Sequence, residues 1–160
     1  MDVFRGEPSP DHEPKAHARN QAQKAQWERD KRVAVTLRPL KYRYQRDARG
    51  LPVRDPATGI KVRSGPPQEK GVDVLRALAL VRGALSSDVD LVILASHDSD
   101  LVPAIDEVLA LGTAKVETFS WYVPGEPSFE LRPTDRAQRT WNTRLNETNF
   151  LNCIDRTNYP

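Results

Sequence analysis

The order of hydrophobic and polar residues along this chain predicts alternating helices and strands. Over about 72–85, apolar residues recur at the spacing of one helical face: Val74, Leu75, Leu78, Val81 and Leu85. The apolar run Leu91–Ala95 has the length of a strand. Because it is apolar on both faces, it predicts a buried strand of a parallel sheet that helices cover. A helix over about 100–111 and a strand over about 115–122 follow.

The amino-terminal segments continue this alternation. Val3 and Phe4 end a short strand, a helix is expected over about 13–30 with Asp11 as its N-cap, and a strand over 32–37. Residues 45–67 are rich in glycine and proline and predict a loop that contains a hairpin. Its arginines and lysines make this loop a candidate substrate flap.

The carboxyl-terminal residues predict one short helix around 135–145, and no internal repeat is expected in the chain. We therefore expect one α/β domain with a mainly parallel sheet over residues 1–123, followed by a tail over residues 124–160.

Two carboxylates follow the apolar run directly, at Asp98 and Asp100. Ligands of open α/β sheets bind outside the carboxyl ends of the strands. Like charges placed close together raise each other's pKa, and a divalent cation removes that cost. The pattern predicts a Mg²⁺ or Mn²⁺ site. The alternative is helix capping, with Asp98 as an N-cap and Asp100 at the positive end of the helix.

A third carboxylate, Asp73, follows Gly71 and lies in the first turn of the helix expected over 72–85. By itself it is explained as an aspartate that the helix dipole stabilises. Together, Asp73, Asp98 and Asp100 precede or open helices at what we expect to be one edge of one sheet. Three converging carboxylates favour a metal site over capping.

The formal net charge of +2 conceals a strong asymmetry. Residues 15–63 hold 14 lysines and arginines against 4 acidic residues, whereas residues 64–160 carry a balance of −5. This distribution suits a polyanionic substrate, with backbone phosphates on the cations and the scissile phosphate at the metal. The alternative is a solvated basic surface that binds nothing.

Several classes of protein are disfavoured. No apolar stretch approaches the roughly 20 residues of a membrane span, and the first residues lack the pattern of a signal peptide. The single Cys153 excludes an internal disulfide and a cysteine-based zinc cluster, and the three histidines are scattered. We expect a cytoplasmic protein without a membrane partner.

With both aspartate segments, the chain resembles the NYN family of PIN-like ribonuclease domains. The matching segments are Phe4-Arg-Gly-Glu-Pro, Arg38-Pro-Leu-Lys-Tyr42, Glu69-Lys-Gly-Val-Asp-Val74, Leu91–Val102 and Val116-Glu-Thr-Phe-Ser-Trp121. The tail segments Trp141-Asn-Thr-Arg-Leu145 and Phe150–Tyr159 are similar to the ends of bacterial members.

The resemblance implies a three-layer α/β/α, Rossmann-like domain that hydrolyses RNA with Mg²⁺ or Mn²⁺. Carried over by position, Asp73, Asp98 and Asp100 are the metal-binding, catalytic acids, and Ser96 and Ser99 shape the loop around them. We place Arg38, Lys41 and Lys70 on the RNA backbone. His97 stands where many relatives have glycine, and a solvent-facing loop histidine is favoured over a substrate contact.

One departure from the family concerns its first strand, which ends in an Asp-x-x-Asn-like motif. Nothing before Val3 supplies that strand. The resemblance therefore predicts a chain that begins at the family's second strand, with weak Mn²⁺ binding and low activity compared with an extended form. Unpaired strand edges would then favour a homo-oligomer or recruitment of another strand.

Two other functions stay open at this stage. A non-catalytic RNA-binding or regulatory module would keep the basic half and the fold without a working acid cluster. A haloacid-dehalogenase-like phosphatase would use Asp98-Ser-Asp100 as its nucleophile pair, although Leu101 follows where threonine or valine is usual.

Overall fold

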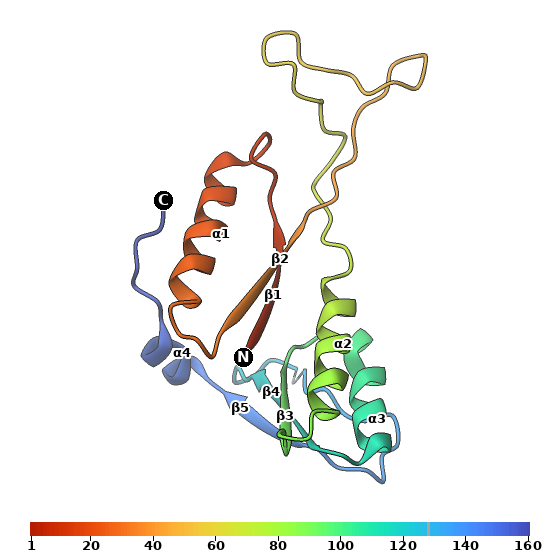
Figure 1. Ribbon diagram of the computed structural model, residues 1–160, viewed down its shortest axis with the longest axis vertical. Coiled ribbons are helices and arrows are strands. Elements are labelled where there is room, and N and C mark those ends of the chain that lie inside the picture. The colour runs from red at the N-terminus through yellow and green to blue at the C-terminus, as the bar shows by residue number, and fades with distance from the viewer. Residues whose placement is uncertain (128) are drawn as a thin grey trace. The chain divides into compact units, whose positions relative to one another are not determined.

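The computed structural model describes residues 1–127 and 129–160 and divides the chain into two compact units. The first unit holds Met1–Val72 and Asn158–Pro160, and the second holds Asp73–Thr157. The first contains the sheet β1-β2, and the second contains the sheet β3-β4-β5 (Figure 1). All three pairings between these strands are parallel, which confirms the expected α/β class with parallel strands.

The first unit is a strand–helix–strand element. It comprises β1 (Asp2–Glu7), α1 (Pro14–Trp27) and β2 (Ala34–Pro39), with Asp2 paired to Ala34 and Glu7 to Pro39. The predicted helix and strands are therefore present. Glu13, rather than the expected Asp11, is the N-cap residue of α1, and it makes no side-chain capping bond.

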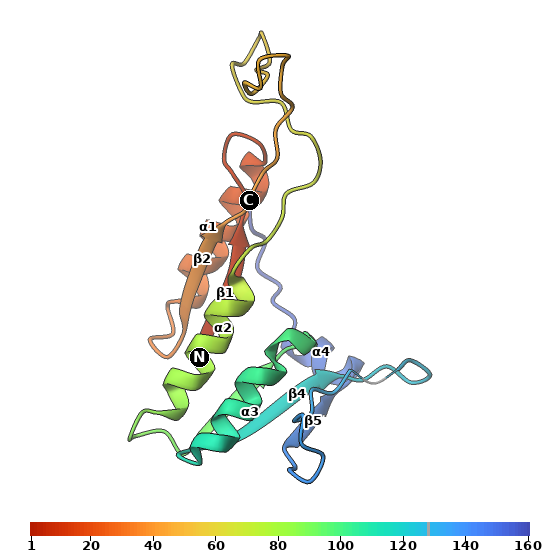
Figure 2. The ribbon, with the colours of Figure 1, turned by 90° about the vertical axis from the view of Figure 1, so that its right-hand side faces the viewer.

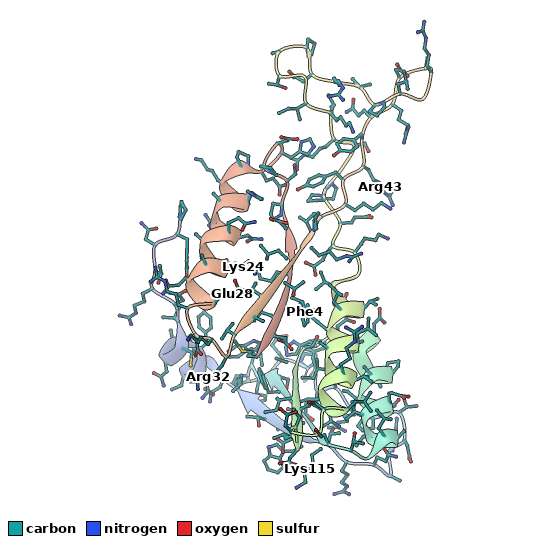
Figure 3. The ribbon with its side chains drawn as sticks, in the orientation of Figure 1. Phe4, Lys24, Glu28, Arg32, Arg43 and Lys115 are labelled. Atoms are coloured by element: carbon teal, nitrogen blue, oxygen red, sulfur yellow. The ribbon has the colours of Figure 1, made fainter. Side chains whose placement is uncertain are left out.

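Polar contacts hold α1 against the β1-β2 sheet. Asn20 Nδ2 donates to the Gly6 carbonyl oxygen at 2.9 Å, and Arg5 Nη1 donates to Gln23 Oε1 at 2.6 Å. Lys24 and Glu28, labelled in Figure 3, both bond to the backbone of Val35 in β2. The Arg5 guanidinium lies over the Trp27 ring, with its Cζ 5.4 Å from the ring centroid.

Residues 41–68 form a long segment of the first unit that follows β2 and is called the arm below. Its two ends pair with each other in antiparallel fashion through the bridges Lys41–Gln68 and Tyr44–Arg63. A further antiparallel bridge joins Arg54 to Lys61, so the hairpin predicted around Val53 and residues 60–62 is confirmed. Figure 1 shows the arm ending in two small loops.

The second unit places two helices on one face of its sheet. Its elements are α2 (Val72–Ala84), β3 (Leu91–Ala95), the 3₁₀ helix η1 (Ser99–Leu101), α3 (Val102–Leu111), β4 (Lys115–Trp121), β5 (Trp141–Leu145) and α4 (Glu147–Cys153). Figure 2 shows α3 alongside β4. The buried core joins Leu80 and Ala84 of α2, Ile105 and Val108 of α3, and Val92 of β3. Within the described residues, no helix combines the length and hydropathy that a transmembrane helix needs.

Two predictions for this unit are wrong. The helix expected around 135–145 is absent; strand β5 occupies 141–145 and extends the sheet beside β4. Its Trp-Asn-Thr-Arg-Leu sequence has the two-residue period and the aromatic and β-branched residues of a strand. Strand β3 is also not covered on both faces, because Leu91 and Ile93 are 39% and 53% exposed while Val92 and Leu94 are buried. The helices α2 and α3 both contribute to the cluster around Val92 and Leu94.

Candidate functional site

The expected acidic loop, Ser96–Asp100, leaves the sheet at the carboxyl end of β3. Ser96 Oγ accepts a hydrogen bond from the Asp98 backbone N–H at 3.1 Å. Asp98 Oδ1 accepts one from the Asp100 N–H at 3.0 Å, which makes Asp98 the N-cap of η1. Asp98 is half-buried, whereas Ser99 and Asp100 are exposed. The structure thus brings Asp98 and Asp100 together, and it also shows the capping contact that the alternative interpretation predicted.

His97 connects this loop to the neighbouring strand. Its Nε2 accepts a hydrogen bond from the Trp121 N–H at 2.9 Å, and its ring stacks on Phe129 at 5.9 Å between centroids. Because an accepting ring nitrogen carries no proton, the proton of the neutral imidazole lies on Nδ1. The side chain is exposed, as expected, and it holds the acidic loop against the end of β4.

Asp73 lies on a different element from the other two acids. It occupies the first turn of α2, where Arg76 Nη1 donates to its Oδ1 at 2.9 Å. Across residues 1–127 and 129–160, no three histidine, cysteine or acidic side chains form a group that would hold a metal ion. Asp73, Asp98 and Asp100 therefore do not form a three-carboxylate metal group in the part of the chain that the structure describes.

The donor atoms of the acidic loop match one class of metal ion. Carboxylate oxygens are hard ligands, and Mg²⁺ usually takes one or two carboxylates while it keeps several waters. Asp98 uses Oδ1 for its cap, and Asp100 is exposed at the start of η1. Two carboxylates placed two residues apart in one loop fit such a hydrated ion, whereas soft thiolate ligands are not offered here.

The cations expected on the substrate lie in the first unit, in the last residues of β2 and on the segments that follow it. Arg38 Nε donates to the Lys70 carbonyl oxygen at 2.7 Å, and the backbone of Lys41 exchanges two hydrogen bonds with Gln68. All three side chains, Arg38, Lys41 and Lys70, are exposed. The segment that holds Lys70 is anchored on β1, where the Gly6 N–H donates to Glu69 Oε2 at 2.7 Å.

Gly6 leaves room for this anchoring. A Cβ atom at this position would lie 2.5 Å from Glu69 Oε2 and would also meet the end of the Leu40 side chain, so both side chains would have to shift. The glycine in the Phe4-Arg-Gly-Glu-Pro segment therefore suits the close approach of Glu69 to β1.

Sequence reasoning missed a buried polar ladder on the core face of the second sheet. Asn142 of β5 donates to Thr118 Oγ1 at 2.8 Å and accepts from Ser120 Oγ at 3.0 Å. Thr118 and Ser120 are almost fully buried. The signal in the sequence is their spacing: Thr118 and Ser120 follow Val116 at steps of two residues, so all three side chains lie on the core face of the strand.

No family model, curated protein or solved structure matches this chain.

Proposed function

We propose that the protein is a metal-dependent ribonuclease of the NYN, PIN-like type with a three-layer α/β/α architecture. The observation that carries this proposal is the position of Asp98 and Asp100, which follow the carboxyl end of β3 in a parallel sheet. This edge is where α/β proteins bind their ligands. The motifs that resemble the NYN family supply the reaction class.

In this proposal Asp98 and Asp100 hold Mg²⁺ or Mn²⁺, and Asp73 is the third acid. Such an ion polarises a phosphoryl oxygen and lowers the pKa of a bound water. Ser96 keeps the loop in shape through its bond to the Asp98 N–H. Ser99, the first residue of η1, is assigned to the same loop by the resemblance to the NYN family. Arg38, Lys41 and Lys70 bind the RNA backbone, because they are exposed cations on adjoining segments of one unit.

Cleavage of a single-stranded RNA with Mn²⁺ or Mg²⁺, and its arrest by a chelator, tests this function. Asp98→Asn removes one charge but keeps an amide oxygen that caps η1, so the fold should persist while cleavage falls by about 100-fold or more. Glu107→Gln is the matched control, because Glu107 is an exposed acid on α3 whose side chain makes no hydrogen bond or ion pair with another described residue. Unchanged cleavage by Asp98→Asn would rule out the site.

A non-catalytic RNA-binding module is the second candidate. It is favoured by one observation, the lack of a three-residue metal-binding group among the described residues. Binding of RNA without cleavage at any concentration of Mn²⁺ or Mg²⁺ would support this candidate over hydrolysis.

A further inference from the structure

The arm, residues 41–68, ends in two loops that follow the same plan in sequence. The first runs Arg46-Asp-Ala-Arg-Gly-Leu-Pro-Val-Arg54, and the second runs Arg54-Asp-Pro-Ala-Thr-Gly-Ile-Lys-Val-Arg63. Both contain Arg-Asp, then a glycine, then an aliphatic residue and a Val-Arg pair. This is a short internal repeat, so the expectation that the chain has none is wrong.

The two loops are also closed by the same pattern of hydrogen bonds. In the first, Asp47 Oδ1 accepts from the N–H groups of Arg49 and Leu51, and Arg46 Nη1 donates to the Gly50 carbonyl oxygen. In the second, Asp55 Oδ1 accepts from the N–H groups of Ala57 and Thr58, and Arg54 Nη1 donates to the Gly59 carbonyl oxygen. Gly50 and Gly59 both have positive φ, 78° and 71°. Each loop is therefore a closed, ordered turn.

The loops meet at a three-way junction of the backbone. Gln45 N–H donates to Val62 O, Val62 N–H donates to Val53 O, and Val53 N–H donates to Gln45 O, each at 2.9 Å. The root of the arm is also fastened, because the Ser9 N–H donates to Tyr42 Oη at 2.8 Å and Arg63 pairs with Glu13 at 2.7 Å. The arm is thus held at its base and at its branch point.

This ordered arm is strongly cationic. It carries seven lysines and arginines and two acidic residues, and both acids face the backbone of their own loops. Hydrogen bonds from Thr58 and Ala57 hold the pKa of Asp55 below its usual value. Arg43, labelled in Figure 3, and Arg49 are exposed, and their side chains make no hydrogen bond or ion pair with another described residue. Their guanidinium groups are available to a ligand.

A hollow of about 350 Å³ lies where the second loop meets the segment before α1. Tyr44, Arg54 and Lys61 line it from the arm, and Asp11 and His12 line it from the segment before α1. Lys61 also lies over the Tyr44 ring, 5.2 Å from its centroid. A polar hollow with two permanent cations suits a phosphate group.

We propose that the arm is a binding surface for the phosphate backbone of RNA, contacted without regard to base sequence. Five of its seven cations are arginines, whose planar guanidinium matches a phosphate in bidentate fashion. Leu51 is the one large apolar side chain exposed on residues 41–68, so an apolar protein partner or insertion into a lipid bilayer is disfavoured. The choice of RNA as the polyanion rests on the proposed function.

The test compares two double variants that lose the same charge. Arg43→Gln with Arg49→Gln removes the unpartnered cations of the arm, and Arg82→Gln with Arg139→Gln removes two exposed cations of the second unit. Binding of a fluorescent single-stranded RNA is measured by anisotropy in EDTA, across a salt series. Each lost phosphate contact should lower the slope of log affinity against log salt by about 0.7.

The arm variant should therefore lose about 1.4 in slope and about 25-fold in affinity at 0.1 M salt, while the control stays close to the unmodified protein. Equal losses in both variants, or no loss in the arm variant, would overturn the proposal. Equally arm-dependent binding to polyglutamate or to anionic lipid vesicles would overturn it as well.

This assay is independent of hydrolysis, because no metal is present. Asp98→Asn should bind RNA as the unmodified protein does. If no metal ion supports cleavage but binding depends on the arm, hydrolysis fails and the arm proposal stands. If Asp98→Asn abolishes cleavage while the arm variant binds RNA normally, the hydrolysis proposal stands and the arm proposal fails.

Discussion

At the scale of single residues, the carboxylates of this chain act mainly on nearby backbone and arginine groups. Asp47, Asp55 and Asp98 each accept hydrogen bonds from backbone N–H groups two to four residues further along. Asp73 pairs with Arg76, three residues on. Asp98 therefore has two roles in our account, as a cap and as a metal ligand, and substitutions separate them.

Asp98→Ala should destabilise the protein by about 1 kcal/mol, whereas Asp98→Asn should change its stability very little, because asparagine caps as well as aspartate. Urea unfolding of the two variants beside the unmodified protein measures the difference. Equal stability of all three would show that the bond from Asp98 Oδ1 to the Asp100 N–H contributes nothing.

Glu130 provides a pH dependence. Arg132 and Arg144 donate to its two oxygens at 3.0 and 2.6 Å and lower the pKa of Glu130 from its usual 4.5. A carboxyl group with a lowered folded pKa stabilises the protein above its unfolded pKa, and that contribution is lost as the pH falls through the folded pKa.

Glu130→Gln should therefore lower the free energy of unfolding at pH 7, by at most about 1 kcal/mol for such a pair. The variant and the unmodified protein should converge as the pH falls below 4.5 and through the folded pKa of Glu130, as urea unfolding at several pH values would record. Glu107→Gln, at an exposed site without such partners, should follow the unmodified protein throughout. A difference for Glu130→Gln that is equal at pH 7 and pH 3 would contradict this assignment.

At the scale of elements, the second unit depends on α3. Ile105 and Val108 are fully buried, and they contact a cluster that reaches from α2 to β4. The residues of β3 divide by face, with Val92 and Leu94 in this cluster and Leu91 and Ile93 exposed. The buried residues of α3 thus pack with residues from only one face of β3.

Ile105→Ala should lower the free energy of unfolding by about 2–5 kcal/mol, because it removes buried methyl groups and leaves a cavity. Leu85→Ala, just beyond the end of α2, is the control; Leu85 is 56% exposed, so its truncation should cost little. Calorimetry or urea unfolding compares the two. Similar costs would mean that α3 is not the centre of the core.

At the scale of the whole molecule, the two units are stabilised in different ways. The second has an apolar core of residues from α2, α3, β3 and β4. In the first, α1 is held by hydrogen bonds from Asn20, Arg5 and Lys24. Burial of apolar surface is the main source of stability, so the first unit should be the less stable.

We expect two unfolding transitions in calorimetry, with the first unit melting at the lower temperature. Ile105→Ala should then shift only the upper transition. Trp27 reports on the first unit, and Trp121 and Trp141 report on the second, so fluorescence of variants that keep one reporter assigns each transition. A single transition that Ile105→Ala shifts as a whole would show that the units unfold together.

The sequence by itself determined the elements whose cause is local. The period of apolar residues located α2, α3 and β4 closely, and the alternation of strands and helices predicted parallel sheets. It also placed Asp98 and Asp100 directly after β3. These features depend on neighbours within one or two turns, which a linear pattern records.

Tertiary structure decided the rest, because the partners lie far apart in the chain. The bond from Trp121 to His97 spans 24 residues, as does the bond from Asn142 to Thr118 that joins β5 to β4. In the arm, the bond from Gln45 to Val62 helps to close the three-way backbone junction, which no local sequence pattern predicts. Contacts of this kind are chosen by geometry among many that the same residues would allow.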